Sequence, residues 1–319
     1  MSALLQTPLP TDRPAPGSFP AEPELFEQTV PRTLVHRAAV SEVLLTGIRP
    51  DGEHAYRVGA QWPRGHSYYG PVAGSWHDPM LLAETIRQAG LLVAHQVLRV
   101  PGDTRFATRD TSFQVTEDGV RLADRPADLV LDVRLSEVSR RGTAVSGFAY
   151  DVTCYRDGRR IGTGSTTAAC IPDRVYRRLR GARAGNVVER PLPEPVAAER
   201  VGRCAEQDVV LGVTEVDQVW TLRADPDHPV LFDHRVDHFP GMVVMEAARQ
   251  AALTALGCPD GLFVGCAGSF RRYIEFDSPC LLSVAEPQNC LGGRSVVPVT
   301  FHQGGAEVAS CDVAVRDPH

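Results

Sequence analysis

Glu84-Thr85-Ile86-Arg87-Gln88-Ala89 and Glu246-Ala247-Ala248-Arg249-Gln250-Ala251 are two copies of the pattern Glu-x-x-Arg-Gln-Ala, 162 positions apart. Each copy lies in a nearly continuous apolar run, and a Ser-Phe pair follows each, at 112–113 and at 269–270. Upstream, residues 41–47 (SEVLLTG) are similar to residues 206–212 (EQDVVLG). A repeat whose flanks recur in the same order indicates two diverged copies of one domain.

The composition is that of an ordinary globular protein. The 319 residues suit about two domains, and hydrophobic residues make up 43% of them. The formal charge of −6, without a basic segment interleaved with aromatics, argues against nucleic-acid binding. The eight cysteines include no Cys-x-x-Cys pair, so we expect reduced thiols rather than a zinc site or disulfides. No leader pattern or membrane-spanning apolar run is present, so we expect a cytoplasmic protein without a membrane partner.

Prolines and apolar patterns divide the chain into four parts. Residues 1–31 contain seven prolines, which predicts a flexible tail. Residues 32–171 and 201–319 are predicted to be the two domain copies, joined by a connector at 172–200 with a short helix at 175–179. In each copy two strands precede a loop and one long helix, and several strands follow. The early strands are predicted at 35–45 and 55–60 in the first copy, and at 205–211 and 219–224 in the second.

The long helices are predicted at 78–98 and 241–256. Asp78 is a good N-cap, and Gly257 suits the C-terminus of the second helix. Because both helices are apolar on most sides, they must be buried, and antiparallel strands can wrap them. We therefore predict an α+β tandem (double) hot dog, each half a central helix wrapped by a curved antiparallel sheet, with the two sheets paired edge to edge as a pseudo-dimer. Two unrelated α+β domains are the alternative, which the repeat disfavours.

The repeated pattern places polar side chains at i, i+3 and i+4, on one face of each helix. On a solvated face such residues would form a weak ion pair, worth roughly a few tenths of a kcal/mol. The flanking residues are too apolar for an exposed helix, and a buried carboxylate has a displaced pKa that suits acid–base chemistry. We interpret both sets as site residues: Glu84, Arg87 and Gln88 in the first copy, and Glu246, Arg249 and Gln250 in the second.

Residues 227–241, before the second helix, are rich in histidine and aspartate. These are metal ligands, but the histidines lie in a loop and not at i, i+4 on a helix, so we predict no metal site. We expect His234 and His238 to position a substrate. Pro240 and Gly241 leave N–H groups free at the start of the helix, which suits a thioester oxyanion or a phosphate.

Two family resemblances follow from these residues. Residues 237–250 resemble the helix start of the hydroxyacyl-carrier-protein dehydratases, but the catalytic histidine of those enzymes would fall near Phe232. A closer resemblance, over residues 35–319, is to the A-factor biosynthesis (AfsA-type) family of tandem hot-dog proteins. It rests on Trp62-Pro63-Arg64-x-His66, His77-Asp78-Pro79-x-Leu81-x-x-Glu84-x-x-Arg87-Gln88-Ala89-Gly90, and His228-Pro-x-x-Phe-Asp233-His234 through Arg249-Gln250.

The resemblance implies a γ-butyrolactone-type autoregulator synthase of secondary metabolism and quorum signalling. Such enzymes move a β-ketoacyl group from acyl carrier protein (or coenzyme A) to a hydroxyl of dihydroxyacetone phosphate. The partners implied are that carrier protein and that acceptor, with no cofactor beyond the phosphopantetheine of the donor. As a pseudo-dimer, the chain is expected to be a monomer or a weak homo-oligomer.

The expected roles follow from the chemistry of acyl transfer. Glu84 or Glu246 is the base, and Glu84→Gln should abolish transfer while the protein stays folded. N–H groups near Asp78 or Gly241 hold the oxyanion. Because hot-dog sites lie between paired domains, we favour one site that combines Glu84 with Arg249. Arg249 or Arg87 pairs with the phosphate, and Arg271 with Arg272 is the second candidate. The remaining candidates are the polar residues His77, Gln88 and Gln250, and the aromatics Tyr69 and Trp76, which line an acyl tunnel or only pack a loop.

Two other functions stay open at this point. A hot-dog thioesterase or dehydratase would use a similar base, but only transfer to a phosphorylated acceptor needs an arginine for the phosphate. A non-catalytic acyl-thioester sensor is the other alternative. It would usually carry an effector domain, and no basic helix-turn-helix segment is visible.

Overall fold

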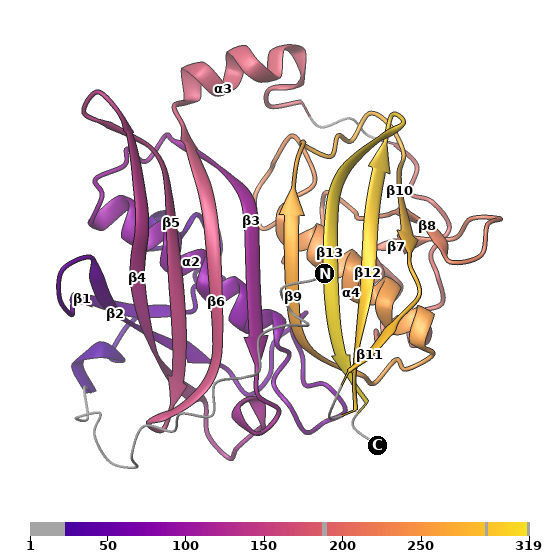
Figure 1. The fold of residues 1–319 in the computed structure, drawn as a ribbon, viewed down its shortest axis with the longest axis horizontal. Coiled ribbons are helices and arrows are strands. Elements are labelled where there is room, and N and C mark those ends of the chain that lie inside the picture. The colour runs from indigo at the N-terminus through magenta and orange to yellow at the C-terminus, as the bar shows by residue number, and fades with distance from the viewer. Residues whose placement is uncertain (1–22, 187–189, 291–292, 318–319) are drawn as a thin grey trace. The chain divides into compact units, whose positions relative to one another are not determined.

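The computed structural model describes residues 23–186, 190–290 and 293–317 (Figure 1). The chain divides between Leu179 and Arg180 into two compact units. Most of the predicted tail lies outside the described residues. Its last part belongs to the first unit, because Leu25 and Val30 are buried and the Val30 N–H donates to the Leu45 carbonyl. No helix in the described ranges is both long and apolar enough to cross a membrane.

The first unit is an antiparallel sheet around one long helix. The strands follow the order β1-β2-β4-β5-β6-β3, and every pairing is antiparallel. The helix α2 lies in the chain between β2 and β3 and covers one face of the sheet (Figure 1). The bounds are β1 Leu45–Pro50, β2 Ala55–Trp62, α2 Met80–Gln96, β3 Arg105–Val115, β4 Ala127–Arg141, β5 Ala144–Arg156 and β6 Arg159–Ile171.

The second unit repeats this plan. Its strands follow the order β7-β8-β10-β12-β13-β9, with β11 paired to β12, and the helix α4 lies in the chain between β8 and β9. Strand for strand, this is the order of the first unit, so the internal repeat predicted from the sequence is confirmed. The bounds are β7 Leu211–Gly212, β8 Val219–Leu222, α4 Gly241–Leu256, β9 Leu262–Phe270, β10 Cys280–Val284, β11 Gln288–Cys290, β12 Arg294–Gln303 and β13 Ala306–Arg316.

Both helices are buried, as their apolar sequences require. Along α2 only Arg87 and Gln96 are not buried, and α4 is buried from Val243 to Leu253. Gly90 is needed for this packing, because the Tyr150 ring occupies the space of a Cβ there, while the Tyr150 hydroxyl donates to the Ile86 carbonyl at 2.9 Å. Each unit is therefore a helix wrapped by an antiparallel sheet, the predicted hot-dog arrangement. The edge-to-edge pairing of the two sheets stays a prediction.

The strands predicted at 35–45 and 205–211 are wrong over most of their length. Residues 32–35, 40–42 and 206–208 form short 3-10 turns, and β1 and β7 begin at Leu45 and Leu211. In both places a glutamine side chain from the central helix takes the backbone hydrogen bonds that a neighbouring strand would otherwise supply. The short helix expected in the connector is confirmed as α3, Asp173–Arg180.

Candidate active site

Glu84 lies at the centre of a buried polar network in the first unit. Its side chain is 2% exposed and contacts two arginines. Arg37 approaches Oε1 at 2.6 Å, and Arg87 donates from Nε to Oε2 at 2.8 Å and from Nη2 to Oε1 at 2.9 Å. Gln88 also donates to Oε1, at 2.6 Å. The predicted stripe is therefore one connected network, to which Arg37 adds a second cation.

Gln88 links this network to the segment that precedes β1. Its amide nitrogen donates to the Glu42 carbonyl at 2.8 Å, and its amide oxygen accepts from the Leu44 N–H at 3.0 Å. The side chain is fully buried. Because these backbone groups are buried too, Gln88 satisfies them where no neighbouring strand is present.

The second unit contains the same network around Glu246, which is 0% exposed. Arg203 and Arg249 each donate from Nη2 to Oε1 at 2.8 Å, and Gln250 donates to the same oxygen at 2.6 Å. Gln250 also donates to the Asp208 carbonyl and accepts from the Val210 N–H, both at 2.9 Å. Each donor of the first network has a counterpart here: Arg203 corresponds to Arg37, Arg249 to Arg87 and Gln250 to Gln88.

Two further histidines extend the repeated networks. In the first unit, His66 Nδ1 accepts from the N–H groups of Tyr68 and Tyr69, and Nε2 lies 3.4 Å from the Glu42 carboxylate. In the second, His228 Nδ1 accepts from two N–H groups of its own loop, and Nε2 lies 3.0 Å from Asp208. These imidazoles hold loops in place, since both ring nitrogens are used within the fold.

Arginine contacts dominate the titration of the two glutamates. Burial alone raises the pKa of Glu84, but Arg37 and Arg87 more than offset it, and the pKa falls to about 2 from its ordinary 4.5. The pKa of Glu246 also falls to about 2, because Arg203 and Arg249 outweigh its burial. Both carboxylates therefore stay ionised near neutrality and have little affinity for a proton, which makes them weak bases.

The two networks differ in one respect. Arg87 binds both oxygens of Glu84, whereas Glu246 Oε2 has no hydrogen-bond partner among the residues that the structure describes. A buried carboxylate oxygen without a donor is costly and is often found where a water or a ligand group binds.

The starts of the two helices also differ. The N-cap of α2 is Pro79 and not Asp78 as predicted, but the buried Asp78 accepts the N–H of Met80, the first residue of α2, on Oδ1 at 2.9 Å. Helix α4 begins at Gly241 after Pro240, and no side chain caps it. The first N–H groups of a helix have no intrahelical acceptor. The N-terminus of α4 is therefore the more open of the two for an oxyanion.

The predicted residues before α2 are buried in the first unit. Tyr69 is 3% exposed and packs on His66, and the Arg121 guanidinium lies over the Trp76 ring. His77 is 2% exposed, and burial, aided by Arg156, lowers its pKa to about 4. It is neutral near pH 7, and its Nε2 has no partner in the described part of the chain.

The loop before α4 places an oriented imidazole three residues before Gly241. His238 Nδ1 lies 2.8 Å from Asp237 Oδ1, and the ring packs edge-on against Tyr273. Asp237 is held in turn, because its Oδ2 accepts the Gly185 N–H at 3.0 Å and Arg180 donates to its carbonyl. A carboxylate on Nδ1 directs the lone pair to Nε2, the arrangement of a general base. His234, in contrast, is exposed and lies 3.3 Å from Asp233.

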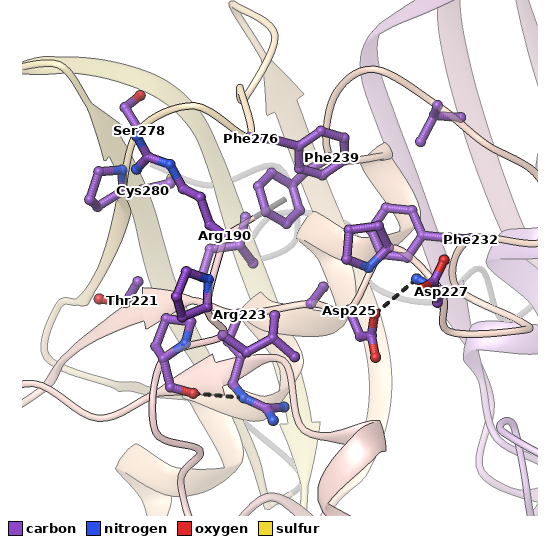
Figure 2. Close-up of a pocket in the computed structure, with 18 of the residues that line it drawn as sticks. Arg190, Thr221, Arg223, Asp225, Asp227, Phe232, Phe239, Phe276, Ser278 and Cys280 are labelled. Atoms are coloured by element: carbon purple, nitrogen blue, oxygen red, sulfur yellow. Dashed lines mark hydrogen bonds between the residues drawn. The ribbon is translucent and has the colours of Figure 1, made fainter. Parts of the chain in front are cut away.

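A cavity of about 440 Å³ lies within the second unit, beside this loop. Phe232, Phe239 and Phe276 form its aromatic wall, with the last two ring centroids 4.6 Å apart (Figure 2). Arg190 and Arg235, both exposed, also line it. Phe232, the residue near the position of the dehydratase histidine, thus supplies an apolar surface. A cavity with this lining can bind an apolar chain that carries a polar group.

The other predicted residues lie near β9. Arg271 pairs with Glu307 at 2.6 Å, and Arg272 is exposed without a side-chain partner among the described residues. No group of three or more metal-ligating side chains occurs within the described ranges.

Arg37 and Arg203 belong to the networks but were missed in the sequence. A signal was present, since each lies five positions before the residue whose carbonyl binds the network glutamine, Glu42 in one unit and Asp208 in the other. Recognising it requires the alignment of two short segments that are only weakly similar.

The chain matches a family and several known proteins. The model of the A-factor biosynthesis hotdog domain matches residues 20–172 and 186–316. A 2-oxo-3-(phosphooxy)propyl 3-oxoalkanoate synthase of Streptomyces virginiae is 45% identical over 90% of this chain and 98% of its own length. A protein of the same name from Streptomyces coelicolor is 38% identical, over 89% of this chain and 91% of its own. An acyl-ACP thioesterase from Bacteroides thetaiotaomicron is similar in fold, with a TM-score of 0.50 and 12% identity over 82% of this chain and 98% of that one.

Proposed function

This chain belongs to the A-factor biosynthesis hot-dog family, and we propose on that basis that it is an acyltransferase. It moves a β-ketoacyl group from the thioester of an acyl carrier protein, or of coenzyme A, to a hydroxyl of dihydroxyacetone phosphate. The hydroxyl oxygen bonds to the acyl carbon, the C–S bond breaks, and the hydroxyl proton passes to the departing thiolate. The ester is a precursor of a γ-butyrolactone or butenolide signal.

One observation carries this proposal. A protein named for the ester of a 3-oxoalkanoate with a phosphooxy-oxopropyl group is 45% identical to this chain, over nearly the whole length of both. The family match, over residues 20–172 and 186–316, includes the two polar networks and the loop before α4.

The loop and the start of α4 supply two of the groups that acyl transfer needs. The uncapped N–H groups at Gly241 can donate to the thioester oxygen as it becomes negative, which stabilises the transition state. His238, oriented by Asp237, is the base that we propose for the attacking hydroxyl, because imidazole is the commonest general base and this one is 26% exposed. It can return the proton to the thiolate.

Glu84, which the sequence suggested as the base, fits that role less well than His238, because a carboxylate whose pKa is about 2 is a weak base. We propose instead that both glutamates orient their arginines and hold the helix against the segment before the first strand. The combination of Glu84 with Arg249 in one site stays a prediction.

The acceptor's phosphate needs a cation that is not already neutralised. Arg87 and Arg249 bind glutamates and Arg271 binds Glu307, so Arg272 is the predicted phosphate ligand that we favour. For the acyl chain we propose the aromatic cavity of the second unit, because Phe239 lines it and lies two residues before Gly241.

The test is mass spectrometry of the purified protein with a β-ketoacyl thioester, with and without dihydroxyacetone phosphate. A phosphorylated ester that forms only with protein and acceptor would support transfer. Release of the free acid at a rate independent of the acceptor would replace this proposal with a thioesterase. Binding of the thioester without turnover would replace it with a sensor.

A further inference from the structure

The helix α3 has a surface unlike the rest of this acidic chain. Its eight residues, Asp-Arg-Val-Tyr-Arg-Arg-Leu-Arg, contain four arginines and one aspartate, whereas the whole chain has a formal charge of −6. It also carries two exposed large apolar side chains, Val175 at 44% and Leu179 at 69% exposure. The helix continues the chain directly after β6 (Figure 1).

Helical geometry separates this surface into two rows. At about 100° per residue, Arg174 and Arg178 form one row and Val175 and Leu179 the row beside it. Tyr176 lies on the opposite face and is 6% exposed, with the Arg105 guanidinium 5.6 Å from its ring centre. The helix is therefore held on its Tyr176 side, and its outer surface presents the arginine row with the apolar row beside it.

The two arginines of the outer row are not used by the fold. Neither Arg174 nor Arg178 forms a hydrogen bond or ion pair with another residue that the structure describes. Arg177, by contrast, pairs with Asp173 at 2.6 Å. Protein interfaces favour arginine around an apolar centre, and complementary charge speeds and orients the encounter.

We propose that this face of α3, defined by Arg174, Val175, Arg178 and Leu179, is the docking surface for the acyl carrier protein that delivers the thioester. It would receive an acidic helix of the carrier with an apolar residue at its centre. The inference rests on the proposed function, which needs a protein-borne donor. A membrane surface fits less well, because amphipathic helices that bind lipid bury a broader apolar face than two side chains.

The test compares two donors of the same β-ketoacyl group, one on the carrier protein and one on N-acetylcysteamine, which lacks the protein. For the double variant R174E/R178E we expect KM for the carrier-borne donor to rise by about tenfold or more, with kcat nearly unchanged. KM for the N-acetylcysteamine donor should stay the same. The matched control is R140E/R141E, an equal charge change on exposed arginines next to the turn between β4 and β5.

A second variant, Leu179→Ser, tests the apolar row without a charge change and should raise the same KM by about fivefold. Equal KM values for wild type and both variants would overturn the docking surface, as would an equal loss with both donors. Carrier binding measured by fluorescence anisotropy, at about 50 and 300 mM salt, separates this inference from the proposed function. Binding that the variants weaken, in a protein that transfers nothing, would retain the docking surface and reject the transferase. Membrane or self-association at α3 without carrier binding would reject the docking surface.

Discussion

Arg203 donates to Glu246 at 2.8 Å across 43 positions of sequence, and Arg37 makes the same contact with Glu84 in the other unit. Each glutamate thus joins its helix to the segment before the first strand of its unit. The contact is buried on both sides, with the Arg203 side chain 7% and the Glu246 side chain 0% exposed. Loss of one partner would leave the other charge buried and unpaired.

Glu84→Gln and Glu246→Gln should therefore each lower the free energy of unfolding by about 3–5 kcal/mol, the usual effect of breaking a buried ion pair from one side. Urea denaturation checks this. Asp51→Asn is the control, since its pair with Arg57 is partly exposed and should contribute at most about 1 kcal/mol. If the Glu84→Gln variant had the free energy of unfolding of the wild type but no transfer activity, Glu84 would be the base after all.

Gln250→Leu should lower the free energy of unfolding by about 1–3 kcal/mol, although leucine is similar in size to glutamine. The Val210 N–H and the Asp208 carbonyl would lose their buried partner. Urea denaturation of the wild type and the variant measures this difference in the free energy of unfolding. Gln61→Leu serves as the comparison, because Gln61 bonds Asp128 on the surface, and a cost as large there would show that the buried position is not special.

The free energy of unfolding should decrease in two stages as the pH is lowered. The pKa of His77 is lowered to about 4 from 6.5, so the unfolded chain takes up that proton first, and stability declines as pH falls from about 6.5 to 4. Between about 4.5 and 2 the unfolded chain protonates Glu84 and Glu246 before the folded one does, and the decline steepens. Each group contributes a slope of up to about 1.4 kcal/mol per pH unit. Thermal melts across this range check it, and His77→Asn should flatten only the upper stage.

His238→Gln should lower kcat by about 10²–10⁴ with little change in KM or melting temperature, because it removes a general base from a partly exposed loop position. His234→Gln is the matched control in the same loop, where the side chain is exposed and oriented less closely. Similar effects of the two substitutions would rule out a specific role for His238.

Phe276→Trp should shift the preference toward shorter acyl chains, since the larger ring reduces the 440 Å³ cavity. A change of one or two methylene groups is worth about 1–3 kcal/mol in a hydrophobic pocket, so kcat/KM for the longest chain should drop at least tenfold relative to the shortest. A competition assay with donors of graded length measures this. An unchanged preference would show that the acyl chain does not bind in this cavity.

The repeat, the two buried helices and the strands that wrap them were predicted from local patterns. Glu84, Arg87 and Gln88 could be assigned to one network because helical spacing alone brings them together. Arg37 could not, because it lies 47 positions from Glu84 and no periodicity links them. The strand predictions for the segments before β1 and β7 were wrong for a similar reason. Their apolar runs are typical of strands, and nothing in them shows that a glutamine of the central helix binds their backbone groups.

The amino-acid sequence by itself determined that this chain is a duplicated α+β domain with polar groups buried along two apolar helices, because hydrophobic burial and helical period act over a few residues. Tertiary structure alone decided what those groups do. Long-range contacts pair each glutamate with an arginine 47 or 43 positions earlier in the chain and lower the pKa of the glutamate. They also hold Asp237, through the Gly185 N–H and the Arg180 guanidinium, where its carboxylate can orient the neighbouring His238. Such contacts join residues that are far apart in the sequence, and no periodic pattern in the sequence predicts which of them meet in the folded chain.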